Sequence, residues 1–342
     1  MNIVIGTELL PFCALSRYAE LIAGGLCARG VGVRIHAFKI VESFGSSVFP
    51  LTKLLLTADE PNVLMGSLGD FPLLQGHMQD KVVWTMWESD VLRPDISCWL
   101  NRQRGIIVPT EWNAKTFRRS GVRVPIEIVP LGLDTQVFYP DVNVFPQKVF
   151  LTAGRSAHAP LRKGLDTVML AFLTAFPTEK DVVLQVKTHP DCPVLDLHCP
   201  RIQIIKMHME QSELVRWYRE GLCYVSGSAA EGWGLHQHEA MACGKPLISV
   251  VYGGVGAFFD PKLHGWQIKH HLVLAEDAAY LNRGHWAKPD LYSMAAAMRE
   301  AYENPYDTFM KGLQASVDVS KLTNTEMFKQ LHHAIQSLLS RR

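Results

Sequence analysis

Apolar residues along this 342-residue chain fall into short runs that alternate with stretches of helical periodicity. The first run is residues 2–5. Residues 15–29 then repeat apolar side chains at helical spacing until Gly30 ends the pattern, and residues 31–38 form the next run of strand-forming residues. This strand-helix-strand opening predicts a parallel sheet whose ligand-binding groups lie at the carboxyl ends of the strands.

The same alternation continues along the chain in two blocks. Further strands are expected at residues 63–65, 81–86, 105–108 and 126–129, and then at 149–153, 182–186, 202–205, 222–226 and 247–251. Helices are expected at residues 112–120, 165–176, 213–220, 235–243 and 291–302. An irregular stretch ending near Pro146 separates the blocks, and the chain is long for one core. We therefore expect two α/β domains, 1–145 and 146–322.

A further helix is predicted at the end of the chain, over residues 323–342. Thr323 and Glu326 have the spacing of a capping box, which marks the start of this helix. Its apolar positions form one stripe, which consists of Phe328, Leu331, Ile335 and Leu338. We treat the helix as a separate terminal element.

Composition and charge narrow the class of protein. Hydrophobic residues make up 48% of the chain and charged residues 20%, and the net charge of +1 gives no general attraction to nucleic acid or anionic lipid. The seven cysteines are odd in number and lie mostly in apolar surroundings, as reduced thiols do. The first residues lack a basic leader, and no apolar run approaches the roughly 18 residues of a membrane span. We therefore expect a soluble, cytoplasmic protein.

Two acidic residues flank a glycine-rich turn in the second block. A run of strand formers at residues 222–226 precedes Glu231, two glycines and the helix-favouring segment 235–243, so that Glu239 falls on the second helical turn. Two carboxylates eight positions apart can contact the two ends of an elongated ligand, and the backbone N–H groups between them favour an anion. A nucleotide-sugar is such a ligand. A strand-turn-helix unit with two solvated acids is the alternative.

Basic residues follow the first strand of the second block, within Gly154-Arg155 and Arg162-Lys163-Gly164. Arginine offers a planar fork to phosphate oxygens and lysine offers a mobile point charge, so that a diphosphate can use both. A solvated basic loop is the alternative.

Both segments resemble motifs of the retaining GT-B glycosyltransferases of family four. Residues 231–246 are similar to the motif Glu-Gly-Phe-Gly-Leu followed by Glu-Ala-Met-Ala-Cys-Gly-x-Pro, and residues 154–166 resemble the Gly-Arg…Lys-Gly donor-phosphate motif. Weaker similarity extends from about residue 105 to about residue 305. The resemblance implies a GT-B fold, in which two Rossmann-like domains face each other across a cleft and the terminal helix crosses back to the first domain.

The resemblance also implies roles for individual residues. Glu239 would hold the ribose hydroxyls and Glu231 the sugar hydroxyls. The expected catalytic residues are Arg155, Lys163 and Glu231, because the two cations would neutralise the departing diphosphate. The expected donor-binding residues are Gly154, Arg155, Lys163, Glu231, Gly232, Gly234, Leu235, Glu239 and Gly254.

The implied reaction moves a sugar, with retention of configuration and without a metal, from a nucleoside-diphosphate-sugar donor to an acceptor hydroxyl. The acceptor is left open between glycan, lipid-linked, small-molecule and polymer hydroxyls. A nucleic-acid acceptor is not excluded, and membrane contact is expected to be at most peripheral. A basic patch is formed by Arg118, Arg119 and Arg123. In one interpretation it binds an anionic acceptor, and in the other it is a solvated helix end.

Several residues depart from the family's pattern. The longer spacing between Arg155 and Lys163 leaves open whether Arg162 shares or takes the lysine's role. His236 and His238 stand where members usually carry apolar residues or proline, and they either reach the ligand or are structural histidines.

The wall of the first domain also differs from that of many members, which carry a histidine there. Trp87 lies near that place in this sequence. Glu88 and Asp90 contact an acceptor hydroxyl in one interpretation and are solvated loop acids in the other.

Other classes of protein were weighed on the same residues. The histidines and cysteines within residues 189–199 match none of the usual zinc-ligand spacings, so that no metal site is expected. A dinucleotide-dependent oxidoreductase has a compatible architecture, but Gly-x-Gly-x-x-Gly is absent after Ile5 and after Ala153. A non-catalytic nucleotide-sugar binding protein remains an alternative, because it needs the same donor-binding residues.

Overall fold

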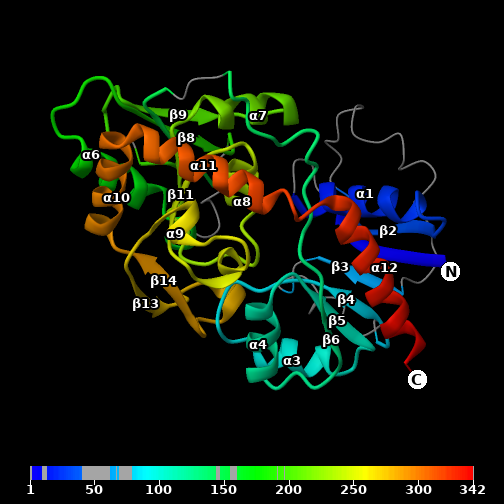
Figure 1. Ribbon diagram of the computed structural model, residues 1–342. Coiled ribbons are helices and arrows are strands. Elements are labelled where there is room, and N and C mark those ends of the chain that lie inside the picture. Colours follow the sequence, from blue (N-terminus) through cyan, green and yellow to red (C-terminus); the bar gives the residue numbers. More distant parts are fainter. Residues whose placement is uncertain are drawn as a thin grey trace.

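The described part of the chain contains two six-stranded sheets and one two-stranded hairpin (Figure 1). The computed structural model describes residues 2–9, 14–40, 62–66, 68, 79–143, 147–154, 160–190, 192–195 and 197–341. In Figure 1 the first sheet, in blue and cyan, lies beside the second, in green and yellow. We keep 1–145, 146–322 and 323–342 as a proposed division of the chain.

The first sheet has the strand order β2-β1-β3-β4-β5-β6, and all of its strands are parallel. Its elements are β1 (Asn2–Leu9), α1 (Ala14–Cys27), β2 (Gly32–Ile40), β3 (Val63–Met65), β4 (Val82–Trp84), α3 (Pro94–Leu100), β5 (Gly105–Val108), α4 (Glu111–Arg119) and β6 (Ile126–Ile128). Every residue of β3, β4 and β5 is buried, as in parallel strands covered on both faces. The expected strands of this block are therefore confirmed.

The second sheet is also parallel, with the order β12-β11-β10-β7-β8-β9. Its elements are β7 (Val149–Ala153), α5 (Pro160–Lys163), α6 (Leu165–Ala175), β8 (Val183–Thr188), β9 (Ile202–Lys206), α7 (Gln211–Glu220), β10 (Cys223–Val225), α8 (Leu235–Ala242), β11 (Leu247–Ser249) and β12 (Gly265–Gln267). The chain order reverses between the neighbouring strands β7 and β10. Ligands of such sheets bind beyond the carboxyl ends of the strands at this reversal.

An antiparallel hairpin follows the second sheet and was not expected from the sequence. The remaining elements of this block are η2 (Gly253–Ala257), α9 (Pro261–His264), β13 (His270–Leu274), η3 (Ala278–Tyr280), β14 (His285–Pro289), α10 (Leu291–Glu303) and α11 (Pro305–Val319). β13 is exposed at almost every position, so that its sequence lacks the buried alternation that marks a strand. None of the helices in the described ranges combines the length and hydropathy that a bilayer crossing requires.

The last helix, α12 (Asn324–Ser340), returns to the first sheet, and Figure 1 shows it in red against α1. The backbones of Leu133 and Asn324 are joined, because Asn324 N donates to Leu133 O at 3.0 Å. Phe328 packs against Gly25 on α1, where a Cβ atom would lie 2.3 Å from the ring. The crossing of the terminal helix to the first domain is therefore confirmed.

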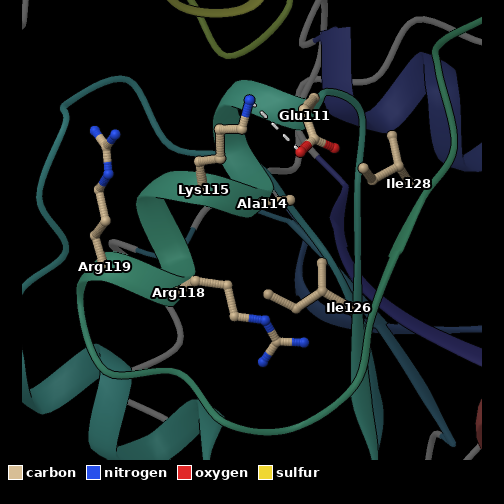
Figure 2. A pocket seen from close by; sticks show the side chains of 7 residues that line it. All are labelled: Glu111, Ala114, Lys115, Arg118, Arg119, Ile126 and Ile128. Carbon is tan, nitrogen blue, oxygen red and sulfur yellow. Dashed lines mark ion pairs between the residues drawn. The ribbon is translucent and has the colours of Figure 1, made fainter.

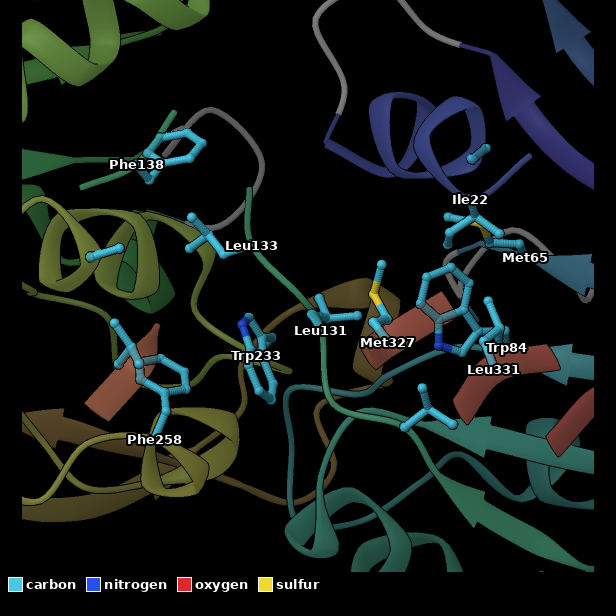
Figure 3. Packing of buried hydrophobic residues seen from close by; sticks show 14 of the residues in the cluster. Ile22, Met65, Trp84, Leu131, Leu133, Phe138, Trp233, Phe258, Met327 and Leu331 are labelled. Carbon is cyan, nitrogen blue, oxygen red and sulfur yellow. The ribbon is translucent and has the colours of Figure 1, made fainter. Parts of the chain in front are cut away.

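One apolar cluster extends from the first sheet across the junction between the two sheets (Figure 3). It includes Trp84 of β4, Leu131 of the connecting segment, Trp233 before α8 and Met327 of α12. Burying one large apolar side chain contributes roughly 1.5–3 kcal/mol to the stability of the folded state. A core that both sheets share therefore stabilises the junction between them.

Candidate functional site

The loops that follow β7 and β10 meet where the strand order reverses. Gly164, between α5 and α6, and Gly227, just beyond β10, touch through their backbones. A Cβ atom added to either would lie 2.2 Å from the carbonyl oxygen of the other. This close approach brings Lys163 of α5 and Glu231, beyond β10, into one site.

A cluster of charged side chains forms there around Glu231. Lys163 Nζ lies 2.5 Å from Glu231 Oε1, and Ser228 Oγ donates to the same oxygen at 2.7 Å. Arg162 Nη1 lies 3.5 Å from Glu231 Oε2 and donates to the carbonyl of Ala230 at 3.1 Å. The side chains of all three charged residues are less than 20% exposed, so that solvent screens their interactions weakly.

The cations determine the protonation state of the carboxyl group. Burial raises the pKa of Glu231, but the charges of Lys163 and Arg162 lower it by more, to about 2. Glu231 is therefore ionised at neutral pH and can only accept hydrogen bonds.

Arg155, the other expected phosphate ligand, lies outside the described residues. Gly154, directly before it, follows the last residue of β7 and lies beside Lys163. Its carbonyl accepts from Thr188 Oγ1 at 2.8 Å, and a Cβ atom at Gly154 would lie 3.5 Å from Lys163 Cβ. The lysine side chain thus runs along the end of β7.

Glu239 lies on the second turn of α8, where its side chain is 15% exposed. Tyr218 of α7 donates its hydroxyl to Glu239 Oε2 at 3.0 Å, and His236 Nδ1 lies 2.8 Å from the same hydroxyl. Burial raises the pKa of Tyr218 well above its usual value, so that the phenol remains a donor. The three side chains form a second polar group, which holds the Glu239 carboxylate in place.

Glycines hold the turn between the two glutamates. Gly234 starts α8 with a φ of 105°, which L side chains rarely adopt. The amide of Gly254 donates to Glu231 O at 2.7 Å, and a Cβ atom at Gly254 would lie 2.2 Å from Gly232 O. Gly254 therefore supports the backbone of the turn that carries Glu231.

Substituting Gly254 by alanine is expected to lower the free energy of unfolding by about 3 kcal/mol, because the new methyl group meets backbone atoms on a buried turn. Urea denaturation followed by circular dichroism measures the change. Gly256→Ala is the matched control from the same 3₁₀ helix, since its Cβ atom would only touch Val251 Cγ1 at 3.5 Å. Equal stability of the two variants would contradict the expected role of Gly254.

His238 does not reach the site, contrary to one of the two interpretations of the sequence. It is fully buried, its ring packs against Trp233 and Phe258, and Trp233 Nε1 donates to its Nδ1 at 3.2 Å. Burial lowers the pKa of His238 to about 4, so that it is a neutral structural histidine. Leu235, on the first turn of the same helix, packs against the shared apolar core.

The loop after β4 of the first sheet contacts the turn that carries Glu231. A Cβ atom at Gly232 would lie 2.5 Å from Met86 Cγ, so glycine permits the loop to approach. Trp87 is buried and its ring lies 4.6 Å from that of Tyr280, whose hydroxyl donates to Glu88 Oε2 at 2.8 Å. Trp87 thus packs against the second domain and does not line an open wall.

Asp90 belongs to the same loop and also contacts the hairpin. It accepts from the amide of His285 at 2.6 Å, and its other oxygen lies 3.2 Å from His285 Nδ1. Both acids that were candidates for acceptor contacts therefore connect the first domain to the second.

The histidine and cysteine segment after β8 contains a ring contact. His189 and His208 pack edge to face with ring centroids 4.6 Å apart. No three His, Cys, Asp or Glu side chains in the described part of the chain are grouped so that they could hold a metal ion. The expectation that no metal is used stays a prediction.

A pocket of about 350 Å³ lies elsewhere, between α4 and the edge strand β6 (Figure 2). It is lined by Glu111, Ala114, Lys115, Arg118, Arg119, Ile126 and Ile128. Arg118, a member of the basic patch, donates to the carbonyls of Val122 (3.0 Å) and Val124 (2.7 Å). This arginine therefore stabilises the segment that follows α4, and for Arg118 the structure shows a structural role within the patch.

The sequence did not reveal Tyr218, Ser228 or Tyr280 as members of the site. Tyr218 lies among the apolar positions of α7, and Ser228 stands three residues before Glu231 in a run of small residues. Their contacts are made between segments that are distant in sequence, so that only the structure shows them. Ser228 could have been suspected, because it lies close to the acidic motif.

Comparison with known proteins agrees with this fold and with the sequence motifs. Residues 194–281 match the family model described as glycosyl transferases group 1. D-inositol 3-phosphate glycosyltransferase 1 from Catenulispora acidiphila is 29% identical over 99 residues, which cover 29% of this chain. The match spans only 20% of the length of that relative.

Solved structures resemble the whole chain. Sucrose-phosphate synthase from Thermosynechococcus elongatus has 16% identity and a TM-score of 0.72 over 99% of both chains. Anabaena HepE, in complex with UDP and glucose, has 14% identity and a TM-score of 0.67 over 98% of this chain and 100% of its own. The lipopolysaccharide outer core galactosyltransferase WaaB has 13% identity and a TM-score of 0.66 over 98% and 99%. The chain therefore has the GT-B fold, and residues 194–281 of it match the family model.

Proposed function

We propose that the protein is a retaining glycosyltransferase that moves a sugar from a nucleoside-diphosphate sugar to an acceptor hydroxyl. The observation that carries this proposal is the cluster at the reversal of the second sheet, in which Lys163, Arg162 and the hydroxyl of Ser228 surround Glu231. Glu239, eight residues from Glu231, supplies a second carboxylate for the other end of the same ligand. The family match over residues 194–281 supports the same activity.

The charges suggest how the donor is bound. Glu239 accepts from the ribose hydroxyls, and Lys163 binds the diphosphate together with Arg155. Lys163 is paired with Glu231 before the donor binds, so the phosphate competes for its ammonium group. Glu231 is then available to accept hydrogen bonds from the sugar hydroxyls. No step of this proposal requires a metal.

The reaction follows from this arrangement. The bond between the anomeric carbon and the diphosphate oxygen breaks, and its electron pair remains on the diphosphate. The acceptor oxygen attacks the anomeric carbon from the same face, and its proton passes to a leaving phosphate oxygen. Lys163 stabilises the charge that develops on this diphosphate, which is the main contribution to catalysis.

The test begins with a thermal-shift screen of uridine, guanosine, adenosine and cytidine diphosphates and their sugars. UDP is the first probe, because HepE binds UDP and glucose. Nucleotide release that rises with an acceptor, and a product with the donor's anomeric configuration by NMR, would support the proposal. Tight binding without release from any donor would instead indicate a non-catalytic binding protein. The acceptor panel contains glycan, lipid-linked, small-molecule and polymer hydroxyls.

Glu239→Ala is expected to raise the Kd of the nucleoside diphosphate at least tenfold, because hydrogen bonds to a carboxylate contribute about 1.5–3 kcal/mol. Isothermal titration calorimetry measures this Kd. Tyr218→Phe is the control, since it removes one hydrogen bond to Glu239 and leaves the carboxylate present. An unchanged Kd in folded Glu239→Ala would argue against the ribose contact.

A further inference from the structure

His236 lies on the first turn of α8, between the glycine-rich turn and Glu239. Its side chain is 37% exposed, whereas the side chain of Glu239 is 15% exposed. The two residues are three positions apart, so that they share one face of the helix and lie about 4.5 Å apart along its axis. A ligand that extends from Glu231 to Glu239 therefore passes beside the His236 ring.

The hydroxyl of Tyr218 joins both of these side chains. It donates to Glu239 Oε2 at 3.0 Å and lies 2.8 Å from Nδ1 of His236. A phenol has only one proton, and a carboxylate can only accept a hydrogen bond. Because the phenol proton lies towards Glu239, the hydrogen bond to His236 uses the proton on Nδ1, which is donated to the phenol oxygen.

This arrangement determines the tautomer of His236. A neutral imidazole carries one N–H group, so that Nε2 keeps its lone pair when Nδ1 is protonated. The Nδ1 edge of the ring faces the buried Tyr218, and the exposed part of the ring therefore includes the opposite edge, which contains Nε2. Among the residues that the structure describes, Nε2 makes no hydrogen bond. The bonds from Nδ1 through the phenol to the carboxylate polarise one another, which strengthens Nε2 as an acceptor.

We propose that His236 is a specificity-determining residue whose Nε2 accepts a hydrogen bond from a ribose hydroxyl of the donor. A ribose has two neighbouring hydroxyl groups, and His236 and Glu239 share them as two acceptors on one face of α8. The pair thereby selects ribonucleoside diphosphates over their deoxy analogues, since a missing hydroxyl leaves an acceptor without its donor. The inference rests on the proposed function, because that function assigns the ribose to Glu239.

The first test identifies the tautomer in the protein without ligand. Long-range proton–nitrogen NMR spectra at about pH 8.5, where an imidazole is normally neutral, distinguish the protonated ring nitrogen from the unprotonated one. The His236 signals are assigned by their loss in His236→Asn. We expect the proton on Nδ1. A proton on Nε2 would overturn the inference, because Nε2 would then be a donor.

The second test uses the shapes of two amide side chains. Asparagine places its amide near the position of Nδ1, so that His236→Asn keeps a donor for Tyr218 and removes the acceptor at Nε2. Glutamine reaches the position of Nε2, where its oxygen can accept. UDP, 2′-deoxy-UDP and 3′-deoxy-UDP are titrated into each protein by calorimetry, and another base replaces uracil if the thermal-shift screen selects it.

The wild-type protein should bind the ribonucleotide more tightly than either deoxy analogue. His236→Asn should raise the Kd of the ribonucleotide about three- to tenfold, which is the effect of one neutral hydrogen bond, and leave the Kd of one deoxy analogue unchanged. His236→Gln should recover part of the lost affinity. His333→Asn is the control and should bind all three ligands as the wild type does, because His333 is exposed on α12, which packs on the first domain.

The outcomes separate this inference from the proposed function. An equal rise of all three Kd values in His236→Asn would show that the ring only supports the fold of the site, and it would overturn the inference. Unchanged Kd values would do the same, and in both cases the proposed function would stand. A wild-type protein that bound none of the nucleoside diphosphates would contradict the proposed function itself, and the ribose contact with it.

Discussion

Replacing Lys163 by alanine is expected to lower kcat about 100- to 1000-fold, which is the effect of removing one group that stabilises developing charge. In the structure this ammonium group lies at the end of β7, 2.5 Å from Glu231. The loss should appear in kcat and in kcat/KM, because the contact with the leaving diphosphate strengthens in the transition state. Steady-state release of the nucleotide from the donor measures both constants.

Lys148→Ala is the matched control for this experiment. Lys148 belongs to the same domain, but it is half exposed and pairs with Asp181, away from the cluster. Its removal should change kcat by less than twofold. The Lys163→Ala protein must also have an unaltered circular dichroism spectrum. If such a protein turned over the donor at close to the wild-type rate, Lys163 would not be the cation that stabilises the leaving group.

Replacing Glu231 by glutamine is expected to remove a pH-dependent part of the stability. Burial raises the pKa of Glu231, but the positive charges of Lys163 and Arg162 lower it by more, from 4.5 to about 2. A lowered carboxyl pKa contributes stability that is fully present above pH 4.5 and is lost as the pH falls from 4.5 to 2. A shift of this size corresponds to a few kcal/mol. Thermal unfolding at steps between pH 6 and pH 2 should therefore show a steeper loss in wild type than in Glu231→Gln.

Glu111→Gln makes the same chemical change on the exposed surface of α4. Its stability should follow the wild-type curve throughout this pH range. Parallel curves for wild type and Glu231→Gln would show that the cluster does not hold the carboxylate in its charged form.

The parts of the site that lie close together in sequence were the most predictable. Glu231 lies on the glycine-rich turn and Glu239 on the helix that follows it. Their spacing alone predicts two carboxylates on either side of an anion site. Lys163 required one further step, because parallel strands place their following loops at the same edge of a sheet. The meeting of β7 and β10 agrees with that geometric argument.

The contacts across the domain junction could not be predicted in the same way. The bond between Glu88 and Tyr280 joins residues 192 positions apart, and no local pattern specifies such a pair. The hairpin that carries Tyr280 was also missed, because the solvent-exposed β13 has no buried alternation. His238 shows the converse, since a polar residue type suggested a ligand contact where packing against Trp233 places it in the core.

The return of α12 has a consequence for the order in which the protein can fold. The chain passes from the first domain towards the second near Leu133 and returns to the first domain at Asn324. The backbones of these two segments are joined by hydrogen bonds. The second domain is thus an insertion between the main part of the first domain and the helix that completes its core. During synthesis, the apolar surface that Leu331 and Ile335 will cover stays open until the whole second domain has been made. The first domain therefore cannot complete its core before the second domain has been synthesised, although its own synthesis begins first.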